Sequence, residues 1–294
     1  MELEEEKLID EILWRNSTRN YFTSGPWEPE IAPLKSLLKR IWNSGDYDRL
    51  SRYMEMEAEA FYRRLAVPPG SRLLDVACGS GQLALIAARR GADATGIDIA
   101  ENMIERAQER ARVEGLKTRF YEADAEDLPF ANAAFNVVAS LAGVIFSPRP
   151  ERAARELLRV CRRGGIIAMA NWTPEGFIGQ LFQMVSRFVA PSGMPDPLLW
   201  GNEATVRERL HTGVSGMELT RRKIALNFPF PPGEVVRFFR ACYGPVNRAF
   251  ASLNREGRMR LQTDMEELWE THNLAKGGFT RVDAEWLEVV AKRA

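Results

Sequence analysis

The sequence is poor in the residues that build disulfide frameworks, metal sites and histidine-based catalytic centres. Its 294 residues include three cysteines, Cys78, Cys161 and Cys242, and two histidines, His211 and His272. An odd number of widely spaced cysteines argues against a disulfide framework or a zinc site. We therefore predict no metal site, and we expect the cysteines to be small buried residues in a reducing cytoplasm.

An excess of charge of either sign is also missing. The chain has 40 basic and 40 acidic residues, so its formal net charge is zero. This removes bulk electrostatic attraction to nucleic acid or anionic membranes, although it leaves room for a local patch. The strongest basic cluster, residues 221–223, falls in an expected strand, where successive side chains point to opposite faces. We expect no nucleic-acid partner.

Long apolar runs are absent as well. The longest, from Val137 to Phe146, is about half the length that a membrane-spanning helix needs. The first six residues are acidic where the n-region of a secretory signal would be basic. We expect a cytoplasmic protein with no membrane span.

What the sequence does contain is one stretch, Leu73 to Gly81, around which the chain is organised. An apolar run followed by small residues and a second apolar run predicts a strand, a tight turn and a helix. Ala77, Gly79 and Gly81 occupy alternate positions of the turn. Small residues there let a ligand approach the backbone, and the following helix directs its N–H groups at that ligand.

An acid at the tip of the next strand points to a nucleoside. Asp98 lies 17 residues beyond Gly81, where a carboxylate accepts hydrogen bonds from ribose hydroxyls. Two cofactors compete, because residues 79–84 also fit the G-x-G-x-x-A dinucleotide pattern. Asp75 favours the other candidate: its carboxylate would repel a pyrophosphate but attract the ammonium and sulfonium of S-adenosylmethionine (SAM).

Strands and helices alternate through most of the chain, which predicts an α/β fold with a doubly wound, mostly parallel sheet. The expected strands are residues 72–76, 94–99, 118–123, 135–140, 166–171, 217–227 and 286–291. The expected helices are residues 34–42, 82–90, 102–114, 151–160, 176–189, 203–211, 233–243, 245–253 and 256–273, together with one through residue 64 and an amphipathic helix within residues 1–15. In such a sheet the ligand lies at the carboxyl ends of the strands.

Four segments resemble a known family. Residues 75–81 resemble the first motif of class I SAM-dependent methyltransferases, Asp98 their ribose-binding acid, and residues 122–125 the segment that holds adenine. Residues 158–165 resemble their "RVLxPGG" turn, with Arg163 in place of proline. The likeness is closest to the methyltransferase type 11 and quinone-biosynthesis-like branch, and it is specific over residues 44–172. It implies the Rossmann-like fold of seven strands, with the last strand antiparallel beside the fifth. Asn136 departs from the usual Asp, which we expect to affect sheet packing more than chemistry.

The resemblance also implies roles around the cofactor. Asp75 would organise the methionine ammonium, Asp98 would hold the ribose hydroxyls, and Asp124 would accept from the adenine amino group. The implied cofactor-binding set is Asp75, Ala77, Gly79, Gly81, Asp98, Ile99, Asp124, Ala125 and Leu141. Leu141 would lie near the reacting end, and the product would be S-adenosylhomocysteine (SAH).

The same resemblance suggests how the chain is divided. Residues 1–66 would form a helical preface or lid over the cofactor, and residues 67–294 the methyltransferase domain. Within that domain, helical elements at about 176–212 and 232–275 would form a cap on the substrate side. We treat the cap as part of one domain, because the final strand must return to the sheet.

Methyl transfer from a sulfonium needs alignment more than acid–base chemistry, and the sequence contains no catalytic triad. His272 is the candidate base, with a surface or capping role as its competitor. Aromatic residues suggest a small, apolar acceptor, and the candidates for its pocket are Tyr47, Phe146, Trp172, Trp200 and Tyr243. The alternatives are a nucleic-acid methyltransferase, an NAD-dependent oxidoreductase on a similar sheet, and a non-catalytic cofactor-binding relative. The acceptor and the oligomeric state stay open.

Overall fold

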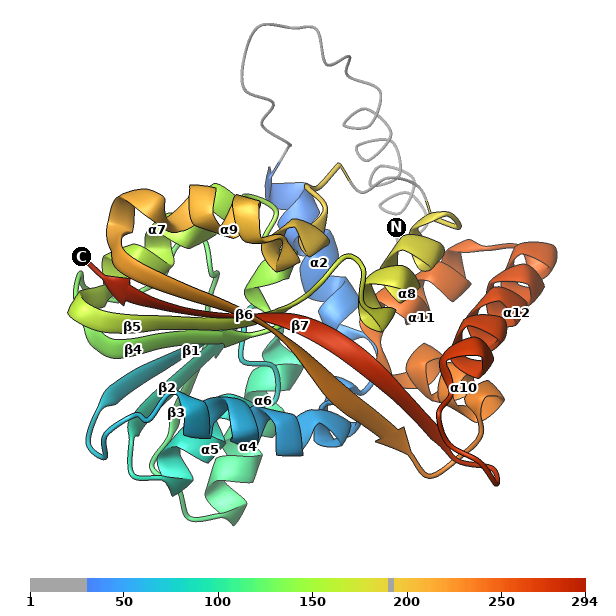
Figure 1. Ribbon diagram of the computed structural model, residues 1–294, viewed down its shortest axis with the longest axis horizontal. Helices are drawn as coiled ribbons and strands as arrows, with labels where there is room; N and C mark the ends of the chain where they lie inside the picture. Colours follow the sequence, from blue (N-terminus) through green and yellow to red (C-terminus); the bar gives the residue numbers. More distant parts are fainter. Residues whose placement is uncertain (1–30, 190–192) are drawn as a thin grey trace, which may run out of the picture.

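The computed structural model describes residues 31–189 and 193–294, and within them the chain forms one seven-stranded sheet flanked by helices (Figure 1). The strands are β1 (Arg72–Val76), β2 (Asp93–Asp98), β3 (Arg119–Glu122), β4 (Phe135–Leu141), β5 (Cys161–Trp172), β6 (Val214–Phe228) and β7 (Thr280–Arg293). Their order is β3-β2-β1-β4-β5-β7-β6. The first five strands run parallel, whereas β7 runs antiparallel to both β5 and β6. The predicted sheet and its reversed seventh strand are confirmed.

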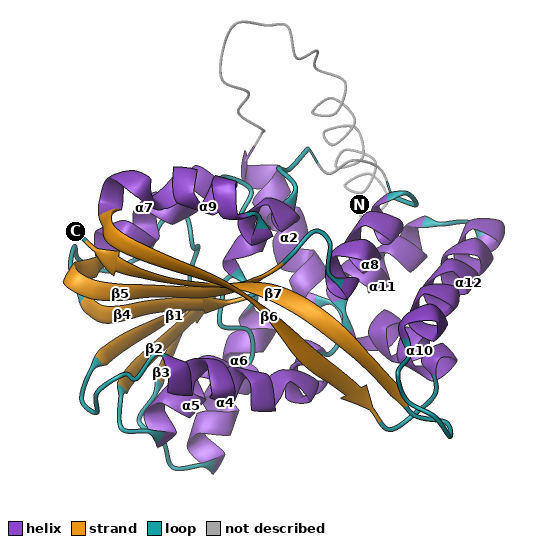
Figure 2. Cartoon of the chain, viewed as in Figure 1, coloured by secondary structure: helices purple, strands orange, loops and turns teal. Residues whose placement is uncertain are grey.

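Helices cover both faces of this sheet (Figure 2). On one face lie α4 (Glu55–Arg64), α5 (Gln82–Arg89) and α6 (Glu101–Val113), and on the other lie α7 (Pro150–Val160) and α9 (Glu203–Leu210). The faces that α5, α6 and α7 turn to the sheet are apolar, as the 3–4 spacing in the sequence predicts. The N-terminal part adds α2 (Ile31–Asn43) and α3 (Tyr47–Ser51), of which α2 contacts both α6 and α11. The predicted helix within residues 1–15 lies outside the described residues.

The antiparallel pair of strands β6 and β7 is longer than the sequence analysis predicted. β5 pairs with β7 only from Lys292 to Trp286, but the pairing of β6 with β7 continues to Thr280. In this extension Val282 and Ala284 are buried while Arg281 and Asp283 are exposed. That alternation is the pattern of a strand covered on one face, and the charged residues masked it in the sequence.

Three helices connect the extended end of β6 to the start of β7. These are α10 (Pro232–Cys242), α11 (Gly244–Ser252) and α12 (Arg255–His272), and α8 (Phe177–Ser186) packs against α12 (Figure 1). Trp269 of α12 is fully buried, with ring centroids 4.5 Å from Phe177 and 5.2 Å from Phe239. The two helices of the segment 176–212 therefore lie in different places. Helix α8 packs against α12, one of the helices between β6 and β7, whereas α9 packs against α7.

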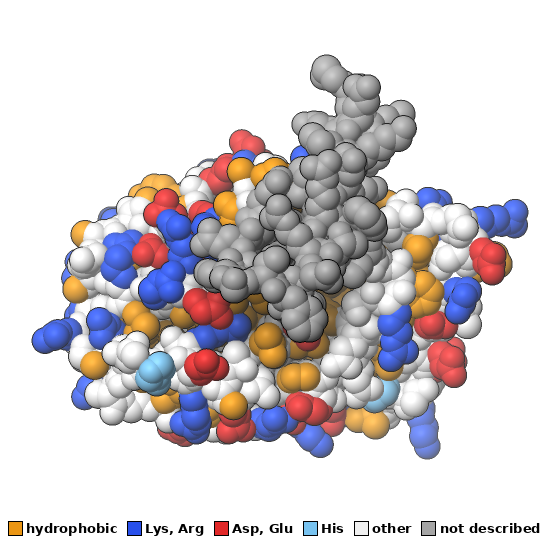
Figure 3. Space-filling model, turned by 90° about the horizontal axis from the view of Figure 1, so that it is seen from above, with side chains coloured by type: hydrophobic (Ala, Val, Ile, Leu, Met, Phe, Trp, Pro, Cys, Tyr) orange, Lys and Arg blue, Asp and Glu red, His pale blue; other side chains and the backbone are white. Residues whose placement is uncertain are grey.

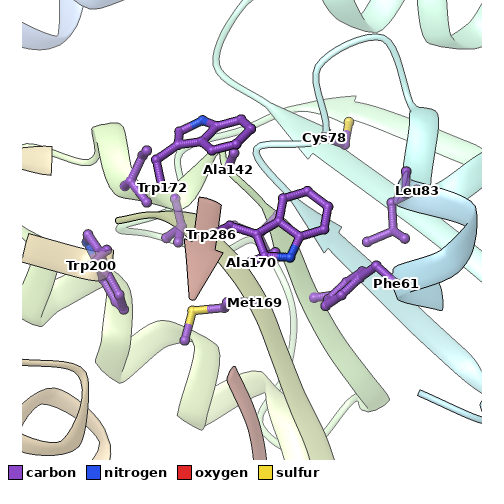
Figure 4. Close-up of a cluster of buried hydrophobic side chains, with 14 of the residues drawn as sticks. Phe61, Cys78, Leu83, Ala142, Met169, Ala170, Trp172, Trp200 and Trp286 are labelled. Atoms are coloured by element: carbon purple, nitrogen blue, oxygen red, sulfur yellow. The ribbon is translucent and has the colours of Figure 1, made fainter. Parts of the chain in front are cut away.

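A second aromatic cluster anchors the sheet to the preface. The Trp286 ring on β7 lies between Phe61 of α4, at 6.4 Å, and Trp172 at the end of β5, at 5.9 Å (Figure 4). Asn136 lies at the other end of the sheet, where its Oδ1 accepts from the backbone N–H of Arg72 at 2.9 Å. It therefore joins β4 to β1, as expected of a packing residue.

The fifth strand begins earlier than predicted. It starts at Cys161, opposite Phe135, and its next pair with β4 joins Ile166 to Val137. The intervening residues 162–165 form an irregularity inside the strand, with Gly164 at a φ of 70°. The turn suggested by the family motif is thus a bulge within β5. None of the described helices is long and apolar enough to cross a membrane.

Candidate functional site

The turn after β1 has the backbone geometry that its small residues suggest. Ala77, Gly79 and Gly81 all have positive φ, at 54°, 53° and 81°. A Cβ on Gly81 would stand 2.7 Å from the ring of Phe120, whereas one on Gly79 would face the ring of Tyr47 at 3.5 Å. Gly81 is thus required by packing behind the turn, and Gly79 lies on its open side.

A cavity with about 1120 Å³ of empty space, counted out to its open mouth, lies at the carboxyl ends of β1, β2 and β4. It holds eight of the nine expected cofactor residues: Asp75, Ala77, Gly79, Asp98, Ile99, Asp124, Ala125 and Leu141. Gly81 is the ninth and does not line it. The charged residues among its described lining residues are Lys35, Asp75, Asp98 and Asp124. We call this first cavity the acid-lined half of the site, because a second hollow lies beside it.

Asp75 is both buried and tied to the following helix. The residue is 1% exposed, and its Oδ2 accepts a hydrogen bond from the backbone N–H of Ala84 at 3.0 Å. Burial raises the pKa of Asp75 to about 8, against the lowering effect of that hydrogen bond, and the charge of Asp98 raises it further. The carboxyl is therefore mostly protonated at neutral pH without a cation nearby.

Asp98 holds the turn from the tip of β2. Its Oδ2 accepts from the backbone N–H of Gly79 at 2.8 Å, and its Oδ1 from that of Ala100 at 2.9 Å. Burial raises the pKa of this carboxyl, and the backbone hydrogen bonds from Ala100, Gly79 and Ile99 oppose the increase. Asp98 lines the cavity, and a carboxylate has about four acceptor sites, so it retains capacity for a hydroxyl donor beyond these three bonds.

Asp124 at the far edge of this half is paired with a residue that the sequence analysis missed. Lys35 on α2 forms ion pairs with Asp124 and, at 2.6 Å, with the fully buried Glu126. Arg149 holds the other side of Glu126 at 2.8 Å. Lys35 and Asp124 are 89 positions apart, so no local pattern could have joined them.

Four of the five expected acceptor residues meet beside this half. A second hollow of about 490 Å³, which we call the aromatic chamber, is lined by Tyr47, Leu50, Tyr53, Met54, Ala142, Phe146, Trp172, Ile178, Phe182, Leu226, Phe228, Phe239 and Tyr243. Of these, Tyr47, Met54, Ala142, Phe146 and Trp172 also line the first cavity, so the two hollows are adjacent. Trp42 was missed by the sequence analysis, and its ring lies 4.8 Å from Phe146 and 5.8 Å from Tyr243.

Trp200 does not reach either hollow. It is 1% exposed, and Figure 4 shows it apart from the pair of Trp172 and Trp286. The guanidinium of Arg209 lies 4.6 Å from the centre of its ring. Trp200 is therefore a core residue that fixes α9 beside β5.

The histidines lie away from the cavity too. The Nδ1 of His272 is 3.0 Å from the carbonyl oxygen of Leu268, and its ring meets Phe177 at 5.3 Å. His211 is exposed after α9, with its Nδ1 near the carbonyl oxygen of Glu208. Neither histidine lines the acid-lined half or the aromatic chamber. In the part of the chain that the structure describes, no cluster of three His, Cys, Asp or Glu side chains could hold a metal ion.

The charges on the surface are mixed. Figure 3 shows basic and acidic side chains interspersed over the described part of the face seen from above. This arrangement matches the zero net charge of the chain.

Comparisons with known proteins agree with this geometry. A family model described as a methyltransferase domain matches residues 74–169. An uncharacterized protein of Mycobacterium tuberculosis is 37% identical over 218 residues, which cover 73% of this chain and 80% of that protein. Methyltransferase GfsG of Streptomyces halstedii is 38% identical over 132 residues, covering 44% of this chain and 48% of that one.

A solved structure of a SAM-dependent methyltransferase from Thermotoga maritima shares the fold, with a TM-score of 0.53 at 14% identity. The match covers 87% of this chain and 99% of that chain. This chain has the strand order, with β7 reversed beside β5, that the resemblance in its sequence predicts, and it has a glycine turn between two buried acids. The chain therefore belongs to the class I SAM-dependent methyltransferases, within the type 11 group, and is a methyltransferase that uses SAM.

Proposed function

We propose that this protein transfers the methyl group of SAM to a small-molecule acceptor and releases SAH. The observation that carries the proposal is that the two hollows adjoin: Tyr47, Phe146 and Trp172 line both the acid-lined half and the aromatic chamber. A nucleoside in the first hollow and a small apolar molecule in the second would thus lie next to each other.

The residues of the acid-lined half fit the chemical groups of SAM. Asp98 would hold the ribose hydroxyls over the open side of Gly79, and Asp124 with the Ala125 backbone would hold adenine against Ile99. Asp75 would face the methionine ammonium, whose positive charge favours its ionised form. Leu141 and Ala77 would line the passage toward the aromatic chamber.

When bound, SAM supplies an electrophilic methyl group on a positively charged sulfur. The task of the protein residues is then to align the acceptor with that methyl group and to exclude water, because in-line displacement depends on orientation. The described residues that line the two hollows include no histidine and, in the aromatic chamber, no carboxylate.

We also propose how the chain is divided for this task. Residues 1–66 would act as a lid, of which α2, α3 and α4 belong to the described part, and residues 67–294 would form the catalytic domain. Lys35 and Tyr47 support the lid, since both come from this segment and line the cavity. The segments 176–212 and 232–275 would form the cap on the substrate side. In support of this, Phe182 of α8 and Phe239 of α10 line the chamber.

The test combines binding with transfer. SAH should bind the purified chain in a calorimeter, and label from methyl-labelled SAM should pass to a component of a metabolite extract. Asp98→Asn should lose both, whereas Asp93→Asn, at the exposed start of the same strand, should keep both. Binding of NADH with no binding of SAH would favour the oxidoreductase alternative. Transfer of label to tRNA, lost as the salt concentration rises, would favour the nucleic-acid alternative.

A further inference from the structure

The aromatic chamber differs from the acid-lined half in its charge. Among the described residues that line it, none is acidic or basic, whereas Lys35, Asp75, Asp98 and Asp124 all lie in the other half. The guanidinium of Arg49 lies 5.4 Å from the ring of Phe238, but neither residue lines the chamber. An ion placed in the chamber would lose its hydration without gaining a partner of opposite charge, which is costly.

The chamber wall consists largely of ring faces and ring edges. Phe182 and Tyr243 are nearly parallel, at 15° and 6.2 Å, and Tyr53 lies 4.6 Å from Phe228. Phe239 meets Tyr243 edge-on at 6.1 Å. Such walls favour a flat ring, which stacks on one face and meets the edges of the others.

Polar handles in the chamber are neutral hydroxyls. Tyr47, Tyr53 and Tyr243 line it, and none of their hydroxyls makes a hydrogen bond to another described residue. Three hydroxyls that lack partners suit a ligand that carries its own oxygen.

Tyr47 and Tyr243 cannot act as bases near neutral pH. Burial, with the charge of Asp98, raises the pKa of Tyr47 to about 12, and burial raises the pKa of Tyr243 well above its usual value. Both phenols stay protonated and can donate a hydrogen bond to a ligand. An acceptor in this chamber must therefore lose its own proton without a base from the described wall.

We propose, building on the methyl transfer proposed above, that the acceptor is an uncharged, flat ring compound with a phenolic or enolic hydroxyl, bound in the aromatic chamber. The acceptor oxygen forms a bond to the methyl carbon, the carbon–sulfur bond breaks, and its electron pair stays on sulfur. The hydroxyl proton passes to water, so the products are a methyl ether, SAH and one proton.

Four naphthalene probes of equal ring size test this assignment on the SAH-loaded full chain. They are 1-naphthol, 1-methylnaphthalene, 1-naphthoate and 1-naphthylmethylammonium, with affinities measured by calorimetry. We expect 1-naphthol to bind at least about tenfold more tightly than either ion, because only the ions must be stripped of water. We expect it to bind about threefold more tightly than 1-methylnaphthalene, because of its hydroxyl.

A charge placed in the wall should reverse the preference. Phe182→Glu, on the half-buried face of α8, should weaken 1-naphthol and bring 1-naphthylmethylammonium to at least equal affinity. Gln183→Glu, on the next and exposed position, adds the same charge outside the chamber and should keep the wild-type order. Melting curves of both variants report whether they fold. Tyr243→Phe serves as a second, milder variant. It should lose the preference for 1-naphthol over 1-methylnaphthalene.

The outcomes separate the two proposals. If SAH binds but the ions bind as well as 1-naphthol, or no probe binds, the acceptor assignment is overturned while the methyl-transfer proposal stands. The assignment also falls if folded Phe182→Glu leaves the order of the probes unchanged. If 1-naphthol binds in the expected order to a chain that never binds SAH, the chamber assignment stands and the proposed function fails.

Discussion

The acid-lined half of the cavity and the aromatic chamber are built from different kinds of structure. The first stands on the tips of β1, β2 and β4 and on the turn at Gly79, so its groups are held by sheet hydrogen bonds and by Asp98. The second has Ala142 and Trp172 at the strand ends but gathers most of its side chains from α3, α8, α10, the end of β6 and the short turns beside them, where they meet through packing. The proposed nucleoside site thus has backbone support, whereas the proposed acceptor site is walled mainly by side chains.

The most severe way to break the first half is to add one methyl group behind its turn. Gly81→Ala would place a Cβ 2.7 Å from the Phe120 ring at a φ of 81°. We expect it to lower the free energy of unfolding by about 3 kcal/mol, the sum of backbone strain and overpacking. Gly115→Ala has a similar φ of 65° but open space, so strain alone should cost about 1 kcal/mol. Equal losses in urea denaturation would show that the Phe120 contact does not constrain the turn.

Removing one charge from the acid-lined half should weaken its ligand without affecting the ligand of the aromatic chamber. We expect Asp98→Asn to weaken SAH about 100-fold, because hydrogen bonds to a buried charged group are among the strongest. The affinity for 1-naphthol should stay within about twofold, since Asp98 does not line the chamber. Asp93→Asn is the matched control, and calorimetry with both ligands is the measurement. A parallel loss of both affinities would mean that the two halves form one unit.

The protonation of Asp75 makes cofactor binding depend on pH. Its pKa of about 8 means that a cationic ligand must displace a proton at neutral pH. Affinity for SAM should therefore rise with pH, by at most about tenfold per unit between about pH 6 and pH 8, and a proton should be released. Calorimetry in buffers of different ionisation enthalpy measures that proton. Asp75→Asn keeps an acceptor for the Ala84 N–H and should abolish the release.

The same group has the opposite effect on the empty protein. Its folded-state pKa lies above that of the unfolded chain, so the folded state holds a proton that the unfolded chain has lost between about pH 4 and pH 8. The free energy of unfolding should fall as pH rises through that window, and less so in Asp75→Asn. An identical pH dependence in the two proteins would argue against the raised pKa.

The smallest effects belong to the ion pairs that join α2 to the sheet edge. Lys35 is 18% exposed and pairs with the buried Glu126, whereas Lys39 is 35% exposed and pairs with the exposed Glu122. We expect Lys35→Met to cost about 1 kcal/mol and Lys39→Met less than about 0.5 kcal/mol. Urea denaturation of both variants gives the difference. Equal costs would mean that burial of Glu126 adds nothing to its pair with Lys35.

Much of the first half was predictable because its signals are local. Asp75, Gly79 and Asp98 belong to a strand–turn–helix–strand unit whose spacing is set by backbone geometry. Gly81 shows the limit of this reasoning: the sequence marks it as special, but only the ring of Phe120 explains why it must be glycine. The pKa of Asp75 was equally out of reach, because burial depends on the whole fold.

The second half was harder to foresee because aromatic residues serve the core and a binding wall equally well. Trp172 and Trp200 look alike in the sequence, yet the first lines both hollows and the second is sealed beside Arg209. Strand β7 was predicted from residue 286 and begins at Thr280, since its charged outward positions hid the alternation.

The sequence by itself determined the order of strands and helices, the glycine turn and the acids at the strand tips, because these follow from hydrophobic periodicity and local backbone preferences. The tertiary structure alone decided which aromatic rings line the chamber, that none of its described lining residues is charged, and that Lys35 meets Asp124. Such features depend on contacts between residues far apart in the chain, and the entropy of closing those loops is repaid only by the packing of the complete fold.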